Sequence, residues 1–190
     1  MRIPIDMLKL NIGCGSVYLE GWVNIDIESE TADLIHDMRN PLPYHDNSID
    51  FIYNEHFIEH LSVDEGVGVM KEFHRVLKPR GVLRIATPDL RRVLFRYFFF
   101  WRRQEWIRKW HRELETRAEM INKSFYSWEH RYLYDTEELK RRLEEAGFTR
   151  LSRKSFRKSG HAELRGLETR KDSKLIMEAV KRSSENIDKA

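Results

Sequence analysis

The chain has 190 residues, of which 41% are hydrophobic and 34% charged, with a formal net charge of +3. This length and composition predict one globular domain over residues 1–182, followed by a polar, frayed tail over 183–190. No stretch reaches the roughly 18 apolar residues of a membrane span, and the charged N-terminal residues indicate no signal peptide. The single cysteine, Cys14, excludes an internal disulfide and is typical of a reducing cytoplasm, where we expect the protein.

The first predicted element is a strand over residues 8–12 that ends at two glycines, Gly13 and Gly15. Glycine accepts the positive φ angles of a tight turn and lets a ligand approach the backbone. A second strand over 23–27 follows after a connection too short for a crossover helix. Its Asp26 can accept both hydroxyls of a ribose. Because the full G-x-G-x-x-G pattern of dinucleotide binding is absent, the pattern indicates a ligand with ribose but no phosphate, such as S-adenosylmethionine (SAM).

Strand and helix patterns alternate along the rest of the chain, which predicts an α/β sheet. Further strands are expected near residues 33–36, 49–53, 82–86, 148–156 and 174–180. Helices are expected over residues 63–77, 90–122 and 136–146. The first helix begins at Ser62 with Glu65 three positions later, the pattern of a capping box.

The stretch from Arg91 to Arg117 combines positive charge with aromatic residues. It holds nine Arg and Lys against three Glu, a local charge of +6, together with eight aromatic residues. One interpretation is a lid whose apolar stripe covers a binding site while the arginines stay solvated. The other is a surface for an anionic partner, either nucleic acid or a membrane surface. We favour the lid.

The motif from His56 to His60 raises an alternative from another class of protein. His56, Glu59 and His60 match H-x-x-E-H, in which two histidines four apart on a helix bind zinc and the glutamate acts as general base. A zinc peptidase needs this motif inside a long helix and a third ligand from elsewhere. The motif instead follows the predicted strand 49–53 directly, so we expect no metal. In a second interpretation, Glu59 and His60 line the entrance of a binding site and His56 faces the substrate. In a third, both histidines simply pack or cap.

Several motifs, taken in order, resemble the small class I SAM-dependent methyltransferases (type 11-like). They are NIGCG, GWVNIDI, LIHDMRNPLPYHDNSIDFIYNEHFIEHL, KEFHRVLKPRGVLRIATPD, HRYLYDTEELKRRLEEAGF and LIMEAVK. The resemblance covers about residues 8–181 and implies a Rossmann-like seven-stranded sheet of order 3-2-1-4-5-7-6 with strand 7 antiparallel. The early crossovers are short, which leaves half of the sheet without helical cover. We expect the 90–122 region or a second subunit, in a homodimer, to cover that face.

The resemblance also implies which residues hold SAM. The residues that match are Asn11, Gly13, Cys14, Gly15, Asp26, Ile27, Asp37, Met38 and Asn54. Asp37 would face the adenine amine and Met38 the ring, although Met38 as plain core is the alternative. Cys14 is interpreted as a small side chain packed under the ligand. Asn11 stands where many relatives have an acid, so it would lack charge attraction to the amino group of SAM.

Methyl transfer from a sulfonium is an in-line displacement that depends mainly on proximity and orientation. A general base is needed only for a hydroxyl or a protonated amine, and the candidates are His56, His130 and Asp89. We expect residues 90–135 to form the lid and select the acceptor. The acceptor is expected to be a small molecule or a glycan, and the positive stretch favours an anionic one. A SAM-binding module without turnover is the main alternative.

Overall fold

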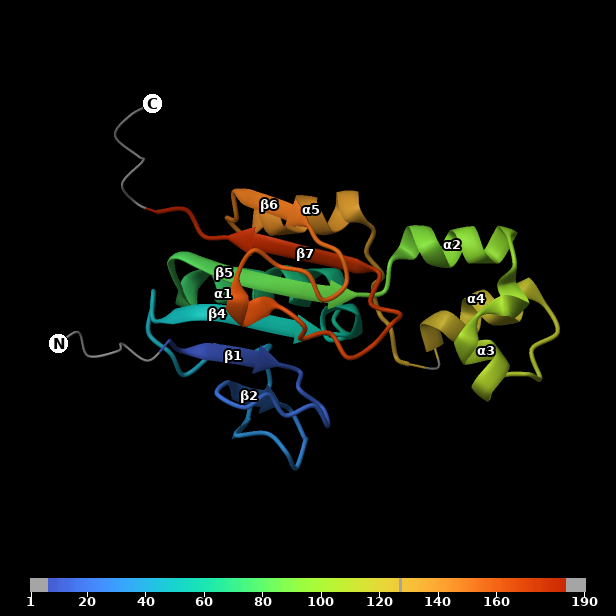
Figure 1. Cartoon of the computed structure of the whole chain (residues 1–190), viewed down its shortest axis with the longest axis horizontal. Helices are drawn as coiled ribbons and strands as arrows, with labels where there is room; N and C mark the ends of the chain where they lie inside the picture. The colour runs from blue at the N-terminus through green and yellow to red at the C-terminus, as the bar shows by residue number, and fades with distance from the viewer. Residues whose placement is uncertain (1–6, 127, 184–190) are drawn as a thin grey trace.

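Seven strands form one sheet in the order β3-β2-β1-β4-β5-β7-β6 (Figure 1). The strands are β1 Lys9–Ile12, β2 Val23–Asp26, β3 Leu34–Ile35, β4 Ile49–Glu55, β5 Leu77–Thr87, β6 Arg150–Arg153 and β7 Leu175–Val180. Strands β1 to β5 are parallel to one another, and β7 is antiparallel to both β5 and β6. The predicted class, strand order and antiparallel strand are therefore confirmed. The computed structural model describes residues 7–126 and 128–183, so nearly all of the predicted tail lies outside the described residues.

The central strands bring their carboxyl ends to one edge of the sheet. Ile12 of β1 pairs with Asn54 of β4, and Asn54 pairs with Ile85 of β5. Most residues of these strands are buried because both of their faces are covered. In open parallel sheets, ligands bind beyond the carboxyl ends of the strands. This edge is therefore where the predicted binding residues meet.

Helices α1 (Val63–Val76) and α5 (Thr136–Glu145) cover one face of the sheet (Figure 1). The predicted capping box is present: the Ser62 amide donates to Glu65 Oε2 at 2.7 Å, and the Glu65 amide donates to Ser62 Oγ at 3.4 Å. Helix α5 begins at Asp135, whose Oδ1 accepts the Glu138 amide at 2.9 Å. The buried side of each helix packs on the main core; the central members are Leu10, Ile52, Phe73, Ile85 and Leu139.

The opposite face is covered by an irregular segment, residues 154–174, that contains the short helix η3 (Ala162–Leu164) (Figure 1). Leu164 packs there in a second core cluster with Tyr53 and Val82. The sequence predicted that the 90–122 region or a second subunit would cover a bare face. The first alternative is wrong, because this segment, and not the 90–122 region, supplies the apolar side chains that cover the face. Cover by a second subunit stays a prediction.

A buried arginine holds the covering segment to the sheet. Arg84 of β5 is fully buried, and its Nε donates to Glu168 Oε1 at 2.6 Å. Its Nη1 donates to Glu178 Oε1 of β7 at 2.6 Å and to the Lys158 carbonyl at 3.1 Å. Burying these charges is costly unless they are paired and hydrogen-bonded. The network therefore fixes where residues 154–174 cross the sheet.

The region predicted as one helical stretch over 90–122 is broken into separate pieces. These are α2 Leu90–Phe98, η2 Trp101–Arg103, α3 Glu105–Trp110 and α4 Arg117–Tyr126, which lie beyond the carboxyl ends of the strands (Figure 1). Phe100 interrupts the helix because it adopts a left-handed conformation with φ 57°. The predicted apolar stripe is also only partly buried: Ile107 and Leu114 form a small cluster with Met120, whereas 61% of Phe98 is exposed.

The two ends of this helical region meet beside the sheet. Asp89 and Tyr134 form an isolated parallel bridge, and the Leu90 amide donates to the Tyr134 carbonyl at 2.9 Å. The chain thus leaves the sheet after β5 and returns to the same place before α5. Within the described ranges, no helix has the length and apolar character needed to cross a membrane.

Candidate functional site

The turn after β1 is built on its two glycines. Gly13 and Gly15 have φ angles of 65° and 51°, and the Gly13 and Cys14 amides donate to the Ile25 carbonyl at 2.8 and 3.1 Å. A Cβ on Gly13 would lie 2.7 Å from the Phe57 ring, whereas a Cβ on Gly15 would meet no atom within 4 Å. Gly13 is therefore needed for packing against Phe57. Gly15 borders open space in which a ligand can approach the backbone.

Asp26 at the end of β2 points at this turn. Its Oδ2 accepts the Gly15 amide at 2.8 Å, and its Oδ1 accepts the Glu28 and Ser29 amides at 3.1 and 3.2 Å. The carboxylate is only partly buried. A carboxylate offers about four acceptor positions, so one position on Oδ2 remains for a ligand hydroxyl. The predicted pairing of glycine turn and acid is therefore present in space.

Asn11 and Cys14 support the turn from inside. The Asn11 amide donates to the Val17 carbonyl at 3.0 Å and to Asn24 Oδ1 at 2.9 Å, so it anchors the loop that follows the glycines. Its direct contact with a ligand stays a prediction. Cys14 is buried. Burial raises the pKa of its thiol, and the nearby Asp26 adds to the rise, so this sulfur stays protonated and acts as a packing group.

The residues predicted around an adenine take different environments. Ile27, next to Asp26, is 53% exposed and offers an uncovered apolar surface at this edge. Met38 is buried in the main core, as its alternative interpretation stated. Asp37 is bound by Arg39, whose Nη2 donates to Oδ2 at 2.6 Å. This hydrogen bonding lowers the pKa of Asp37 to about 2. The adenine contacts of all three stay predictions.

Asn54 supplies the clearest sign that a ligand group is needed at this edge. It is fully buried at the end of β4, and neither its Oδ1 nor its Nδ2 has a hydrogen-bond partner among the described residues. Buried polar groups are almost always hydrogen-bonded in folded proteins. An unpaired amide here fits the polar methionine end of SAM. Together with Asp26 and the open space at Gly15, the residues present therefore fit this cofactor.

His56 is enclosed and held by neighbours. Its Nε2 lies 3.0 Å from Ser173 Oγ, and that hydroxyl donates to Glu55 Oε1 at 2.7 Å. Because the serine proton goes to the carboxylate, the His56 Nε2 must be the donor to Ser173. Its Nδ1 then faces Glu59 Oε1 at 3.2 Å. Burial lowers the pKa of His56, so the ring is neutral and helps to anchor residues 169–173.

Glu59 is the most deeply buried acid of the site, on the short helix η1 (Ile58–His60). Its Oε2 accepts the Thr87 hydroxyl at 2.8 Å, while its Oε1 has no hydrogen-bond partner among the described residues. Burial raises the pKa of Glu59 well above its ordinary value. The zinc-peptidase helix is not formed, because His56 precedes a single 3₁₀ turn and has a positive φ of 54°.

His60 and His130, and not His56, line the pocket beside this edge. The pocket has a volume of about 710 Å³, and its walls also include Asn122, Phe125 and Arg131. The two rings lie 5.2 Å apart between centroids. His130 Nδ1 donates to the Ser124 carbonyl at 2.9 Å, which leaves a lone pair on Nε2. Burial, with a contribution from His60, lowers the pKa of His130 to about 4.

Asp89 caps a helix. Its Oδ1 accepts the Arg91 amide at 3.0 Å at the start of α2, and its Oδ2 accepts from Arg153 Nη2 at 2.8 Å. Both oxygens are thus engaged and only 6% of the residue is exposed. The structure supplies a structural role for this side chain, and its predicted role as general base stays untested.

Sequence reasoning missed the contacts that carry His130 to the site. The Arg131 and Tyr132 amides donate to the Glu59 carbonyl at 2.8 and 3.1 Å, which seats the segment after α4 on η1. It also missed the Glu55 carboxylate, which accepts from Thr169 and Ser173 in the covering segment. No periodicity marks such contacts. His130 itself was among the predicted bases, because the resemblance implies a histidine just before the last helix.

Comparison with solved structures shows the fold. A SAM-dependent methyltransferase from Thermotoga maritima, described as a possible histamine N-methyltransferase, shares 19% identity with a TM-score of 0.56, covering 92% of this chain and 82% of that one. A SAM-dependent methyltransferase from Archaeoglobus fulgidus shares 15% identity with a TM-score of 0.57, covering 92% and 86%. Phosphoethanolamine N-methyltransferase 2 from Haemonchus contortus, in complex with phosphomonomethylethanolamine and S-adenosylhomocysteine, shares 14% with a TM-score of 0.57, covering 93% and 49%.

Comparison of the amino-acid sequence with protein families also indicates a methyltransferase. No curated protein matches the sequence. A family model described as a methyltransferase domain matches residues 12–153, a span that contains the glycine turn, Asp26, Asn54 and both pocket histidines. The predicted resemblance is therefore confirmed, and the chain belongs to the methyltransferase family.

Proposed function

We propose that this protein transfers a methyl group from SAM to a small-molecule or glycan acceptor. The observation that carries the proposal is the turn at Gly15, where open space adjoins a carboxylate with a free acceptor position. Membership of the methyltransferase family and the fold of its structural neighbours support it. SAM supplies the electrophilic methyl group, carried on a sulfonium that is a good leaving group.

Each binding residue then has a defined task. Asp26 accepts a ribose hydroxyl, and Ile27 presents its exposed side chain to the adenine side. Asn54, whose amide is buried and unpaired among the described residues, hydrogen-bonds the methionine end. Gly13, Cys14 and Gly15 shape the turn, while Asn11 fixes the loop behind it. Asp37 and Met38 complete the adenine side in the proposal.

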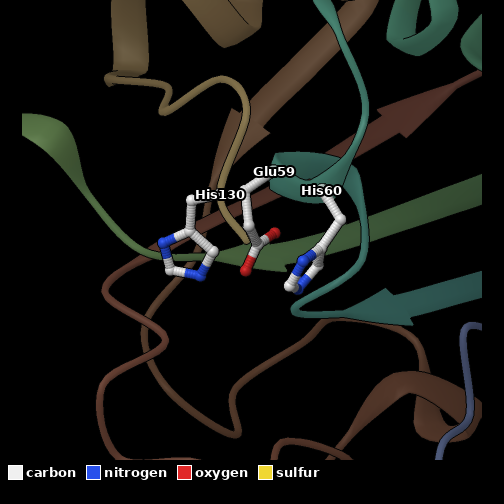
Figure 2. A group of neighbouring side chains, drawn as sticks. All are labelled: Glu59, His60 and His130. Atoms are coloured by element: carbon white, nitrogen blue, oxygen red, sulfur yellow. The ribbon is translucent and has the colours of Figure 1, made fainter. Parts of the chain in front are cut away.

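The pocket lined by His60 and His130 is the proposed acceptor site. Its two histidines lie near the carboxyl ends of the central strands (Figure 2), and the helices α2 to α4 lie beyond the same edge of the sheet (Figure 1). His130 is neutral with a free Nε2 lone pair, so it is the better placed of the three predicted bases to take a proton from a hydroxyl acceptor. His56 and Asp89 are engaged in other hydrogen bonds.

The positive stretch from Arg91 to Arg117 supports an anionic acceptor. Arg102 and Arg103 lie over the rings of Trp101 and Phe100 at 4.8 Å, so their charges remain close to the apolar surface. One structural neighbour was solved with phosphomonomethylethanolamine, a small phosphorylated amine. Nucleic acid or a membrane surface as partner, a homodimer and a cytoplasmic location remain weaker predictions.

Turnover distinguishes the enzyme from a binding module that has kept the fold. The purified chain is titrated with SAM and with S-adenosylhomocysteine by calorimetry. It is then incubated with SAM carrying a deuterated methyl group and an extract of metabolites and glycans. We expect binding of both compounds, and mass spectrometry should detect S-adenosylhomocysteine together with one extract component that gains the label. Binding without either product would favour the module, and absence of binding would refute the proposal.

A further inference from the structure

Three side chains bring metal-binding atoms together at the wall of the pocket. One ligand atom each from Glu59, His60 and His130 lies within 4.8 Å of the other two. Figure 2 shows the carboxylate of Glu59 between the two imidazole rings. Both histidines line the pocket, whereas Glu59 is fully buried. Two imidazoles and one carboxylate are ligands typical of Zn²⁺, Mn²⁺ and Fe²⁺ sites.

Glu59 is oriented as a ligand would be. Its Oε2 accepts the Thr87 hydroxyl at 2.8 Å, which fixes the carboxylate plane. Its Oε1 is buried and has no hydrogen-bond partner among the described residues. The nearest polar atom of His56, Nδ1, also carries a lone pair, because Nε2 donates to Ser173. A buried carboxylate that faces another acceptor needs a proton or a cation beside it.

His130 is oriented in the same manner. Its Nδ1 donates to the Ser124 carbonyl at 2.9 Å, so the free lone pair is on Nε2. Metal-bound histidines almost always donate their other ring nitrogen to a carbonyl or a carboxylate, and this contact fixes the tautomer and the ring. The Ser124 carbonyl belongs to α4, and the following segment is hydrogen-bonded to the Glu59 carbonyl. The hydrogen bonds that would orient two of the metal ligands are therefore present: Thr87 to Glu59, and His130 to the Ser124 carbonyl.

We propose that Glu59, His60 and His130 bind one divalent transition-metal ion of the Zn²⁺ or Mn²⁺ type. Ligand atoms at about 2.1 Å from a tetrahedral ion lie roughly 3.4 Å apart, so binding requires the side chains to close by little more than 1 Å. Both histidines line the pocket, so a further ligand of the ion would reach it from there. This differs from the metal-independent protein expected from the sequence, because His130 is 70 residues beyond His60 and only folding brings them together.

The consequence for the acceptor rests on the proposed function. An ion at this place binds an acceptor through oxygen, since divalent ions of this type hold hydroxyl, carboxylate and phosphate oxygens. The metal site therefore favours acceptors with a hydroxyl, carboxylate or phosphate group over purely hydrocarbon acceptors. It also gives His60 and Glu59 a role that the glycine turn and Asp26 leave unexplained. With its Nε2 lone pair on the ion, His130 serves as a ligand in place of the general base described above.

Metal binding can be measured without knowing the acceptor. The untagged 190-residue chain is stripped with a chelator, dialysed and titrated with ZnCl₂ and with MnCl₂ by calorimetry. We expect one ion per chain. His130→Asn keeps an amide donor for the Ser124 carbonyl but removes Nε2, and Glu59→Gln keeps the size of the side chain. Each should weaken binding by roughly tenfold or more. His45→Asn makes the same chemical change at an exposed histidine and should leave binding unchanged.

A second measurement needs no variant. Co²⁺ added to the wild-type chain should move the proton NMR signals of two histidine rings far outside their usual range. Three results would each overturn the proposed metal site. They are the absence of a stoichiometric ion, equal metal affinity of the His130→Asn variant and the wild type, and a spectrum in which Co²⁺ shifts the signals of no two histidines. SAM affinity measured on the same samples reports separately on the proposed function. If the chain binds metal but not SAM, the metal site is supported and the proposed function is refuted. If it binds SAM but not metal, the proposed function stands and the metal site is refuted.

Discussion

Replacing Asp26 with alanine should weaken SAM binding by roughly 10- to 150-fold. Three of the four acceptor positions of the carboxylate are taken by the amides of Gly15, Glu28 and Ser29. One position remains for a ribose hydroxyl without rearrangement of the turn. A hydrogen bond to a charged group contributes about 1.5–3 kcal/mol. At 1.4 kcal/mol per factor of ten, this single bond gives the range stated.

The structure also separates this effect from general damage to the turn. Alanine leaves three backbone amides without their acceptor, but these lie in part-buried or exposed positions where water can replace the carboxylate. Glu28→Ala removes the same charge two residues away, so it is the matched control. The midpoint of thermal unfolding of each variant shows whether the fold is retained.

Calorimetric titration with SAM and with S-adenosylhomocysteine measures the affinities of the wild type and both variants. Equal affinity of the Asp26→Ala variant and wild type would refute the assignment of the ribose to this carboxylate. A loss well above a thousandfold in a folded variant would contradict the count of one free position. In that case Asp26 would release an amide and hold both hydroxyls. A comparable loss in the Glu28→Ala control would show that net charge alone is responsible.

Three further predictions concern stability and the acceptor. Arg84→Met leaves two buried carboxylates without their main partner and should cost about 3–5 kcal/mol, measured by urea unfolding; a loss below 1 kcal/mol would contradict the inferred role of this network. Hydrogen bonding to Arg141 lowers the pKa of Glu138 to about 2. The ionised Glu138 therefore stabilises the fold, by at most about 1 kcal/mol. This stabilisation is fully present above the pKa of the unfolded state, about 4.3, and it is lost as the pH falls toward 2. Glu138→Gln should therefore flatten the pH dependence of the free energy of unfolding in that window, and an unchanged acid slope would argue against it. Replacing Arg102, Arg103 and Arg108 with glutamine should raise the acceptor KM more at low salt than at high salt, and it should leave the SAM Kd unchanged. Lost SAM affinity in a folded triple variant would instead place the stretch in the cofactor site.

Local signals predicted the sheet well because they act over short distances. The capping box at Ser62 and the cap at Asp135 placed the starts of α1 and α5 within one residue. The apolar runs before Gly13 and Asn54 are strands whose ends form the site. Strand order itself could not be derived from periodicity, and it came from the resemblance of several motifs taken together.

Contacts between residues far apart in the sequence account for the features that were not predicted. Residues 154–174 carry no regular apolar period, yet Arg84 holds them against a face that was expected to need a helix or a second subunit. The stripe over 90–122 suggested one helix, but the left-handed Phe100 turns the chain and leaves much of the stripe in water. The pocket pairs His60 with His130 for a similar reason, since backbone hydrogen bonds to Glu59 bring the later segment back.

The bridge between Asp89 and Tyr134 makes the helical region a closed excursion of the chain. Its entry and exit are joined by a backbone hydrogen bond of 2.9 Å, so its length hardly affects the sheet: each doubling of a flexible loop costs only about 0.6 kcal/mol. Residues between Leu90 and Tyr134 could thus be shortened, extended or exchanged for those of another methyltransferase, with the glycine turn and Asp26 left untouched. The segment proposed to select the acceptor and the residues proposed to bind the cofactor can then be inherited, or engineered, independently.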